Sequence, residues 1–541
     1  MSIGWTQHLI IAPVLIPLIC GALQVPIKHS RHWFKFLLSL VSVLSLTAVA
    51  IALVMLTDGE HWRHGIGVYL AANWMAPFGI ALLADRLSAM LLLVTALLST
   101  AALLYSMLRW SRVGVHFQSL FQFLIMGLNG VFLTHDLFNL FVFFEVMLAA
   151  SYGLLLHGYN ASRLRSGMHY IAINLVASLL FLIGVALIYA SSGTLNMADL
   201  ASRIARMNDT DLALLKLAVT VLAVAFLVKS AMWPLGFWLP AAYATASPPV
   251  GAMLVLMTKV GAYAILRVWL LVFSDDAGDA AGFGFDALLW GGMATIVYGA
   301  AGMLASESPG RMAGYGAIVS SGTLLAVVGY GQPSLVTAGL YYMVGSTLAV
   351  AAFILLIELI DRIRTPGASV LAVTMEAFAI EDAPEPPVGV GIPAALAFLG
   401  LSFAACALII AGLPPLSGFV AKFSMFHALL MPETAGHGNG FVRWMLMALI
   451  VISGLAAIIS MLRFGVRTFW ASGDIAPPRL QAAEVVPICM LILACVVMTV
   501  QAGPVFDYLR RTSDGIHQPA QYMQRVLDEP AVPNPPKENA K

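Results

Sequence analysis

Four ionisable side chains lie alone inside long apolar segments of this sequence. They are Glu145, Lys229, Lys259 and Lys422. If those segments span a bilayer, each charge costs roughly 2.5–3.5 kcal/mol to insert, and such residues usually face the protein interior and mark an ion path. The four residues are therefore the candidate groups for moving protons through the membrane.

Glu145 and Lys229 are the predicted switching pair. Glu145 lies near the centre of its apolar segment, and Lys229 precedes Pro234, a residue that breaks helices. A carboxylate near an ammonium keeps both groups charged, whereas burial favours a neutral lysine once its partner moves away. The alternative for Glu145 is an ion pair that only positions helices.

Lys259 and Lys422 extend this pair into a predicted relay. Lys259 lies about ten residues into its segment, and Lys422 follows the break at Pro414 and Pro415 by about two helical turns. Because none of the four groups can reach all the others directly, we expect water to join them laterally at mid-membrane. The alternative for the three lysines is that each side chain snorkels to the membrane surface.

Other polar residues are assigned structural roles. Asp85 and Arg86 form an expected interfacial pair, and Glu358 and Asp361 are expected to be solvated. The candidate bridging histidines are mostly expected at the interface; they are His135, His169 and His427. Five hydroxyl residues could line water but more often bond back to their own helix; they are Ser320, Ser321, Thr323, Ser346 and Thr347.

The composition requires a lipid environment. Hydrophobic residues make up 60% of the 541 residues and charged residues 10%, against roughly 45–50% and about 25% in soluble domains. The net charge of +1 gives no indication of nucleic acid binding. The four cysteines lack metal-ligand spacing and are expected to be small core residues, and no GxxxxGK[ST] loop occurs, so no metal, cofactor or nucleotide is predicted.

The elements that position these residues are about fourteen transmembrane helices. Apolar runs of spanning length occur near residues 8–26, 35–56, 87–108, 117–134, 136–157, 168–190, 212–246, 249–273, 284–305, 313–330, 334–360, 391–430, 441–462 and 484–503. The first is expected to be a retained span rather than a signal peptide. Lys and Arg concentrate in the loops after odd-numbered helices, so these loops are predicted to be cytoplasmic and both termini to lie outside.

The runs 212–246 and 391–430 are too long for one span, and each pairs a proline break with a lysine. They are helices 7 and 12, so helices 4–8 and 9–13 would be inverted repeats with discontinuous helices, an arrangement that places ion sites near the midplane in many transporters. Residues 364–393 are expected to be a flexible or interfacial connector, and the tail after Arg511 a disordered terminus with, as the alternative, a docking role.

Three motifs resemble one known superfamily over most of the chain. They are HDLFNLFVFFEVML at 135–148, KSAMWPLGFWLPAAYATASPPV at 229–250 and GLPPLSGF at 412–419. These segments are similar to the proton-translocating, antiporter-like subunits of respiratory complex I, of membrane-bound hydrogenases and of Mrp (Pha, Mnh) cation/proton antiporters. The stretch from Asn139 to Glu145 followed by Ser151-Tyr152-Gly153 most resembles the D subunit of the Mrp type.

The resemblance implies an all-α fold of fourteen helices with two inverted five-helix repeats and discontinuous helices 7 and 12. It also implies a proton-channel glutamate at Glu145 and channel lysines at Lys229, Lys259 and Lys422. Family members often carry a histidine or lysine in helix 11, which residues 341–356 lack, so Ser346 and Thr347 with water would have to replace it. The corresponding division is 1–110 for helices 1–3, 111–275 and 276–470 for the two repeats, and 471–541 for the last helix and tail.

The expected function is that of a bacterial inner-membrane subunit of a hetero-oligomeric antiporter, in which proton entry drives the extrusion of Na⁺ or K⁺. The runner-up is a redox-driven pump subunit of a complex I-like or hydrogenase assembly. A purely structural scaffold gives no reason to keep isolated charges at mid-membrane. The expected partners are the other antiporter subunits and lipid, and no enzymatic activity is expected.

Overall fold

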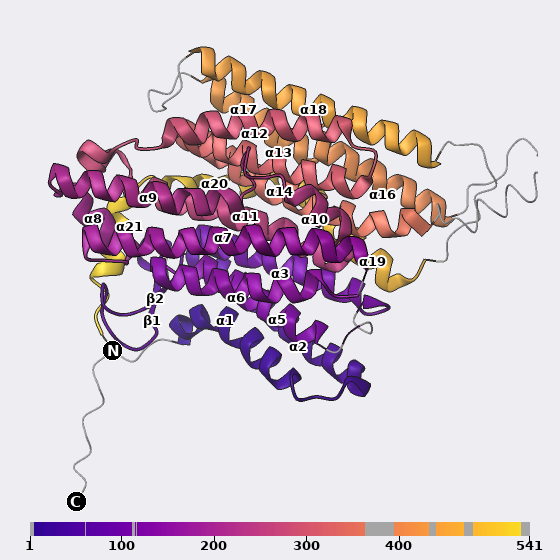
Figure 1. Ribbon diagram of the computed structural model, residues 1–541, viewed down its shortest axis with the longest axis horizontal. Helices are drawn as coiled ribbons and strands as arrows, with labels where there is room; N and C mark the ends of the chain where they lie inside the picture. The colour runs from indigo at the N-terminus through magenta and orange to yellow at the C-terminus, as the bar shows by residue number, and fades with distance from the viewer. Residues whose placement is uncertain are drawn as a thin grey trace, which may run out of the picture.

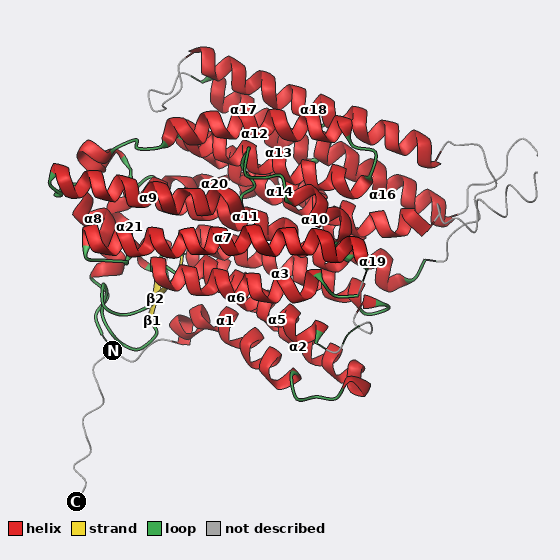
Figure 2. Ribbon diagram, in the orientation of Figure 1, coloured by secondary structure: helices red, strands yellow, loops and turns green. Residues whose placement is uncertain are grey.

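The computed structural model describes residues 5–59, 61–110, 114, 116–158, 160–362, 394–431, 440–469 and 480–531. The described chain is a bundle of roughly aligned helices with one short β-hairpin (Figures 1 and 2). α1 begins and α21 ends at the same end of this bundle, and Gln7 Nε2 donates to Glu529 Oε1 there at 3.3 Å (Figure 1). We call it the N-terminal end, and the other the opposite end.

The long helices follow the predicted apolar runs. They are α1 Trp5–Gln24, α2 His32–Asp58, α3 Arg86–Ser106, α5 Phe117–Leu133, α6 Leu137–Leu155, α7 Ala161–Ser192, α9 Asp209–Lys229, α11 Pro248–Val272, α12 Phe285–Ala305, α13 Pro309–Tyr330, α14 Pro333–Asp361, α16 Ala394–Ala411, α18 Gly440–Phe469 and α19 Ala482–Val500. Shorter elements are β1 Gly67–Leu70, β2 Ala81–Ala84, α8 Met197–Ile204, α10 Leu239–Thr245, α17 Ser417–Leu430, α20 Ala502–Ile516 and α21 Pro519–Leu527.

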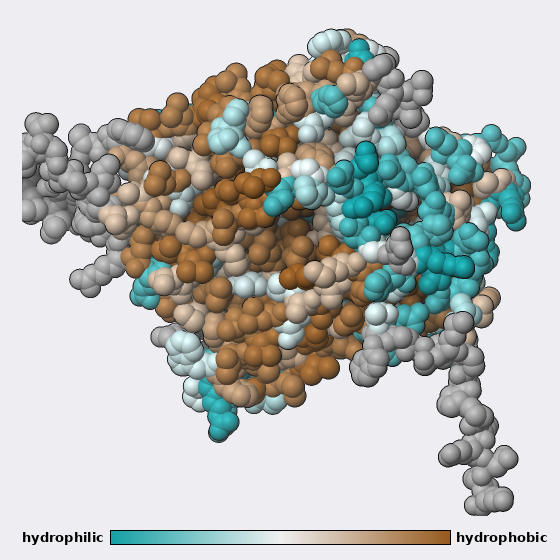
Figure 3. Space-filling model, turned by 180° about the vertical axis from the view of Figure 1, so that it is seen from behind, coloured by the Kyte–Doolittle hydropathy of each residue, from teal (hydrophilic) through white to brown (hydrophobic). Residues whose placement is uncertain are grey.

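The prediction of about fourteen spans is confirmed. Thirteen of the described helices are long and apolar enough to cross a membrane, and α5 is a shorter apolar helix of 17 residues. Seventeen residues lie at the lower limit for a span. α5 therefore accounts for the one predicted segment, 117–134, that is not among these thirteen helices. The hydropathy of the surface agrees, because a broad apolar band covers the bundle and hydrophilic residues gather at the N-terminal end (Figure 3).

The core of the bundle is formed by α11, α13 and α14. All of the most apolar stretch of α11 is buried, whereas only a third of the corresponding stretches of α1, α2 and α19 is buried. α11 packs against α3, α9, α13 and α14. Lys259 is therefore carried by the most enclosed helix of the described chain.

Two predicted spans are discontinuous, as expected. α9 ends at Lys229, residues 230–238 are not helical, and α10 follows; α16 ends at Ala411, and α17 begins at Ser417. The first break begins four residues before Pro234, so the helix has already ended when the chain reaches that proline. The second break contains Gly412, whose φ of 78° favours glycine, followed by Pro414 and Pro415. The inverted relation of the two repeats, and the four-part division of the chain, remain predictions.

The expectation of disorder after Arg511 was wrong for residues up to 527. α20 and α21 fold back across the N-terminal end of the bundle and bury Leu509, Tyr522 and Val526. Both helices are amphipathic, so one face packs on the bundle while the other remains polar. The connector predicted at 364–393 and the end of the tail lie outside the described residues.

The loop between α2 and α3 contains an antiparallel hairpin that the sequence did not predict. β1 pairs with β2 in the register Gly67 opposite Ala84, and β1 also packs on α1. The hairpin leads directly to Asp85, the residue that caps α3 by accepting from Ser88 N at 2.8 Å. Its position therefore fixes the Asp85 carboxylate at the N-terminal end.

Candidate functional site

Glu145 and Lys229 face the same interior region without forming a direct ion pair. Lys229 Nζ lies 3.4 Å from Ser178 Oγ on α7 and 5.6 Å from the centre of the Phe144 ring. Glu145 Oε1 is buried and has no hydrogen-bond partner among the described residues. An unpartnered buried carboxylate oxygen leaves room for a proton or a water molecule between the two groups.

The break after α9 is held in place by neighbouring helices. Ala231 adopts a positive φ of 55°, and Trp233 N donates to Thr295 Oγ1 of α12 at 2.9 Å. Gly261 of α11 approaches so closely that a Cβ there would lie 2.6 Å from Ser230 N. α11 thus packs directly against the residue that follows Lys229.

Lys259 is joined to α13 and α14 by a series of hydroxyl groups. Lys259 Nζ donates to Ser320 Oγ at 2.7 Å and lies 3.4 Å from Ser321 Oγ. Ser320 Oγ in turn lies 2.7 Å from Ser346 Oγ, where either atom can donate. A hydroxyl both donates and accepts, so this series can pass a proton from the ammonium across two helices.

A small cavity continues the series toward the second broken helix. Its lining includes Tyr342, Gly345 and Ser346 of α14 and Ser417 and Gly418 at the start of α17. Ser417 Oγ is buried and has no hydrogen-bond partner among the described residues. The cavity therefore places an unpartnered hydroxyl of α17 opposite the Ser346 end of the series.

Lys422 binds the C-terminal end of α16, at the second helix break. Its Nζ donates to Ala411 O, the last residue of α16, at 2.8 Å and lies 3.5 Å from Ile450 O of α18. The last carbonyls of a helix lack partners inside it and carry partial negative charge, so they stabilise an ammonium. Gly412 and Gly454 leave the space that this side chain fills.

The three lysines do not snorkel to the membrane surface. Lys229, Lys259 and Lys422 are only 4%, 1% and 7% exposed, and each ammonium contacts an oxygen inside the bundle. Among the five predicted hydroxyl residues, Ser320, Ser321 and Ser346 take part in the Lys259 series. Thr323 and Thr347 bond back to their own helices, at Val319 O and Met343 O, so Thr347 does not replace the missing bridge.

Asp85 does not pair with Arg86, contrary to the expectation. Arg267 of α11 holds the Asp85 carboxylate through two hydrogen bonds of 2.6 and 2.9 Å, and Arg86 instead lies 3.5 Å from Asp58. Although burial alone raises the pKa of Asp85, the Arg267 guanidinium holds it well below its usual range. Arg267 was not among the predicted site residues. An arginine eight residues after Lys259 in the same apolar segment could have indicated a further buried charge.

His135 is fully buried within the protein, in the turn between two helices at the N-terminal end of the bundle. It lies between α5 and α6, and its Nδ1 contacts the hydroxyl of Tyr522 from α21. Burial and the nearby Arg267 charge lower the pKa of His135 to about 3, so the imidazole is neutral. His169 and His427 are exposed side chains on α7 and α17, which fits the interfacial expectation for these two.

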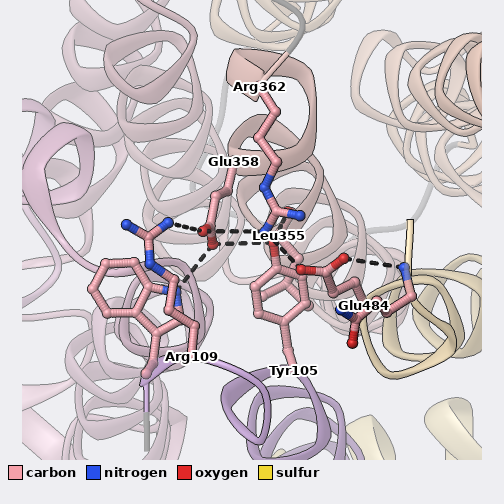
Figure 4. A network of polar contacts seen from close by, with 8 residues as sticks. Tyr105, Arg109, Leu355, Glu358, Arg362 and Glu484 are labelled. Atoms are coloured by element: carbon pink, nitrogen blue, oxygen red, sulfur yellow. Dashed lines mark hydrogen bonds and ion pairs between the residues drawn. The ribbon is translucent and has the colours of Figure 1, made fainter. Parts of the chain in front are cut away.

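Glu358 is mostly enclosed rather than solvated, with its side chain 13% exposed, and it belongs to a network of polar contacts (Figure 4). Its carboxylate accepts from Tyr105 and Trp110 and pairs with Arg109 at 3.2 Å. Arg362 bridges Glu358 and Glu484, at 3.4 and 2.6 Å, and thereby joins α14 to α19 (Figure 4). Burial opposes the charge of Arg362, but the Glu484 carboxylate raises its pKa above the ordinary value. Asp361 is exposed, as expected.

Within the described part of the chain, no group of three His, Cys, Asp or Glu side chains is placed to hold a metal ion. Cys20, Cys406 and Cys495 are buried, but Cys489 is exposed on the bundle surface, so the expectation of a core cysteine was wrong there.

The chain matches one protein family over residues 134–382, described as the transmembrane part of NADH:quinone oxidoreductase and Mrp antiporter subunits. The D subunit of a probable K⁺/H⁺ antiporter from Rhizobium meliloti is 50% identical, over 97% of this chain and 98% of its own length. The D subunit of a Na⁺/H⁺ antiporter from Alkalihalophilus pseudofirmus is 32% identical, over 97% and 100%.

Solved structures agree with this similarity. A chain of the Mrp complex from a Dietzia species superposes with a TM-score of 0.81 at 26% identity, over 97% of this chain and 100% of its own length. A chain of respiratory complex I from Thermus thermophilus shares the fold, with a TM-score of 0.72 at 22% identity, over 96% and 100%. The chain therefore belongs to the family of D subunits of multisubunit, Mrp-type cation/proton antiporters.

Proposed function

We propose that this chain is the proton-translocating D subunit of a multisubunit monovalent cation/proton antiporter in a bacterial inner membrane. The observation that carries the proposal is the Lys259–Ser320–Ser346 series. It runs from α11, which packs on the first helix break, across α13 to α14, in the buried centre of the bundle. Its transport role is also supported by the relatives that cover the whole chain, which are named as antiporter subunits.

In this proposal the four buried charges hold the moving proton in turn. Glu145 and Lys229 form the switching pair, separated in the described state and able to approach when a proton or water binds between them. Lys259 passes the proton to Ser320 and Ser346, and water in the small cavity carries it past Ser417. Lys422, bound to the end of α16, is the terminal group of the second half.

K⁺ is the first cation to test. The relative with 50% identity is named for K⁺ and the relatives near 30% for Na⁺. The proposal leaves both this chain and a partner subunit as routes for the cation. The distribution of basic loops favours both termini outside, so the N-terminal end of the bundle would face the periplasm.

The experiment that tests the proposal is cation-induced collapse of ΔpH in everted vesicles from an antiporter-deficient host. It compares the whole operon carrying the wild-type chain, Glu145→Gln, and Asp276→Asn, an exposed loop carboxylate that serves as the matched control. A native gel checks assembly of each complex. We expect Glu145→Gln to abolish K⁺- and Na⁺-induced collapse and Asp276→Asn to retain it.

Full activity of an assembled Glu145→Gln complex would remove Glu145 from the proton path and leave it a structural role. Absence of antiport in the wild-type operon would favour the redox-driven alternative.

A further inference from the structure

The N-terminal end of the bundle contains a buried charge cluster that the relay described above does not use. Asp85 and Arg267 form a two-point ion pair, with side chains 13% and 5% exposed. A buried ion pair gives little net stability, since desolvation offsets much of its attraction. Its presence beside a proton path therefore calls for a functional explanation.

His135 and Tyr522 complete this cluster, which we call the end cluster: Asp85, His135, Arg267 and Tyr522. Tyr522 packs edge-on against the His135 ring at 5.2 Å, and the Arg267 guanidinium lies 5.8 Å from the Tyr522 ring. His135 Nε2 is buried without a hydrogen-bond partner among the described residues. A neutral imidazole carries one N–H and one bare nitrogen, so the cluster contains one buried nitrogen that can accept a proton.

The end cluster and Lys259 are connected along α11. Lys259, Tyr263 and Arg267 are spaced by four residues, so they follow one face of the helix over about 12 Å. Tyr263 lies between the two charges; its hydroxyl donates to Phe132 O at 3.0 Å, and the Arg267 guanidinium lies 5.7 Å from its ring. One phenol separates the end cluster from the centre of the relay.

On its other side the end cluster borders a cavity at the N-terminal end of the bundle. Hydrophilic residues gather at this end of the surface (Figure 3). The cavity lining includes Asp85, Arg86, Arg267, Arg511, Gln521 and Tyr522. α20 and α21 supply one wall, and they are anchored by Arg511 to Asp58 at 3.0 Å and by Tyr508 to Arg86 O at 2.7 Å. Tyr522 therefore lies where the folded-back C-terminal segment meets the buried histidine.

We propose that the end cluster gates a proton entry route from this cavity through Tyr263 to Lys259, and that Tyr522 holds the gate closed through its contact with His135. This inference rests on the proposed function, because it supplies the outer opening of that relay. The transferred species is the proton: the Arg267 guanidinium repels Na⁺ and K⁺, and Asp85 is already occupied by Arg267.

Protonation of His135 provides the opening signal. The charged and titratable groups that face it are Asp85 ahead of α3, Arg267 of α11 and Tyr522 of α21. In the closed cluster burial and Arg267 keep the imidazole neutral, whereas in water its pKa returns to about 6.5. Proton binding therefore favours the state in which α21 has moved away, and Tyr522 acts as a positioning residue.

The test is cysteine accessibility in the assembled complex, in a background in which Cys20, Cys406, Cys489 and Cys495 are replaced by serine or alanine. A charged, membrane-impermeant methanethiosulfonate is added from the side of the N-terminal end. Tyr263→Cys is the reporter below the gate, Gln521→Cys in the cavity wall is the positive control, and Leu222→Cys in the α9 core is the negative control.

Because only the thiolate reacts, the labelling rate of Tyr263→Cys is divided at each pH by that of the open control Gln521→Cys. We expect this ratio to be low at about pH 7.5 and at least about tenfold higher at about pH 5.5. Addition of Tyr522→Phe should make labelling fast at both values, and addition of His135→Gln should remove the pH dependence. Tyr341→Phe, which removes a different buried hydroxyl that donates to Met498 O at 2.9 Å, should change nothing. The protection factors of the 519–527 amides in the otherwise unmodified complex, which are corrected for the intrinsic pH dependence of exchange, should fall from about pH 7.5 to about pH 5.5.

Equal labelling ratios of Tyr263→Cys in all variants at both pH values, together with unchanged protection of 519–527, would overturn the gate. Neither labelling nor hydrogen exchange depends on antiport, so the two proposals can fail separately. An active Glu145→Gln complex would overturn the role of Glu145 without affecting the labelling result. A pH-independent labelling of Tyr263→Cys would overturn the gate without affecting the result for Glu145.

Discussion

At the residue scale, the structure explains how isolated lysines are tolerated in a lipid-embedded core. Each ammonium finds an oxygen supplied by another helix: Ser178 for Lys229, Ser320 for Lys259 and Ala411 O for Lys422. Hydroxyl and carbonyl oxygens satisfy the ammonium without fixing its charge as a carboxylate would. In the proposed function, these partners leave the lysines able to gain and lose a proton.

Ser320→Ala removes the hydroxyl that links Lys259 to Ser346. One hydrogen bond to a charged group is worth about 1.5–3 kcal/mol, so we expect the antiport rate to fall by about tenfold or more. Ser321→Ala is the matched control, because its hydroxyl lies 3.4 Å from Lys259 Nζ against 2.7 Å for Ser320. Equal rates for the two variants in everted vesicles would exclude a special role for Ser320.

Gly454→Ala crowds the terminal lysine. A Cβ at this position would lie 2.7 Å from Lys422 Nζ and 2.6 Å from Ala411 O, so the ammonium must leave its helix-end site. We expect a loss of about 1–3 kcal/mol in the free energy of unfolding and a marked fall in antiport. Gly400→Ala, which meets no atom within 4 Å, should leave both melting temperature and antiport unchanged.

At the element scale, the broken helices and the folded-back C-terminal helices matter most. α9 and α16 both end inside the bundle. At the end of α16 the Ala411 carbonyl accepts from the Lys422 ammonium, whereas the last-turn carbonyls of α9 accept from backbone N–H groups of the break. α20 and α21 cover the N-terminal end, and their anchors reach α2, α3 and the turn before α6. We expect their docking to depend on a neutral His135, which contacts Tyr522 of α21.

The stability of this docked segment should depend on pH. Burial and Arg267 lower the pKa of His135 from 6.5 to about 3, so the unfolded chain binds the extra proton between these values. The stability contribution is complete above pH 6.5 and is lost as the pH falls toward 3. Thermal unfolding of the purified complex should therefore show a falling melting temperature below about pH 6.5, and His135→Gln should reduce that slope. A slope identical in both proteins would contradict this account.

At the scale of the whole molecule, charge clusters tie the bundle together at its two ends. The end cluster joins α3, α11 and α21, and the Glu358 network joins α3, α14 and α19 (Figure 4). Between them the described bundle carries the lysines in an apolar interior. In the two proposals made here, the Glu358 network holds its end of the bundle fixed, whereas the end cluster opens when His135 is protonated.

Arg362→Ala leaves the Glu358 and Glu484 carboxylates facing each other without their shared partner. Removing one member of a fully buried pair costs about 3–5 kcal/mol, and the partial exposure of Arg362 reduces this to about 2 kcal/mol. We expect a lower melting temperature of the detergent-solubilised complex, with antiport retained below it. Arg311→Ala, at an exposed arginine, should leave the melting temperature unchanged. An equal fall in melting temperature in both variants would contradict a stabilising role for the Arg362 bridge.

The sequence by itself determined the number and order of the spans, the two breaks and the four charges isolated within the apolar segments. Transfer from water to lipid depends on the composition of each local segment, so hydropathy and the prolines near Lys229 and Lys422 suffice for these features. The resemblance of residues 135–148 and 229–250 to antiporter subunits was likewise carried by local motifs.

Only the tertiary structure decided which group each polar side chain contacts. Asp85 meets Arg267 and not its neighbour Arg86, Glu358 meets Arg362 and not water, and α21 reaches back to His135 across most of the chain. Polar side chains buried in a bundle bond to whichever helix packs beside them, and that choice depends on the packing of segments far apart in the sequence. The hydrophobic pattern therefore placed each charge at its depth in the membrane, and helix packing chose the group that it binds.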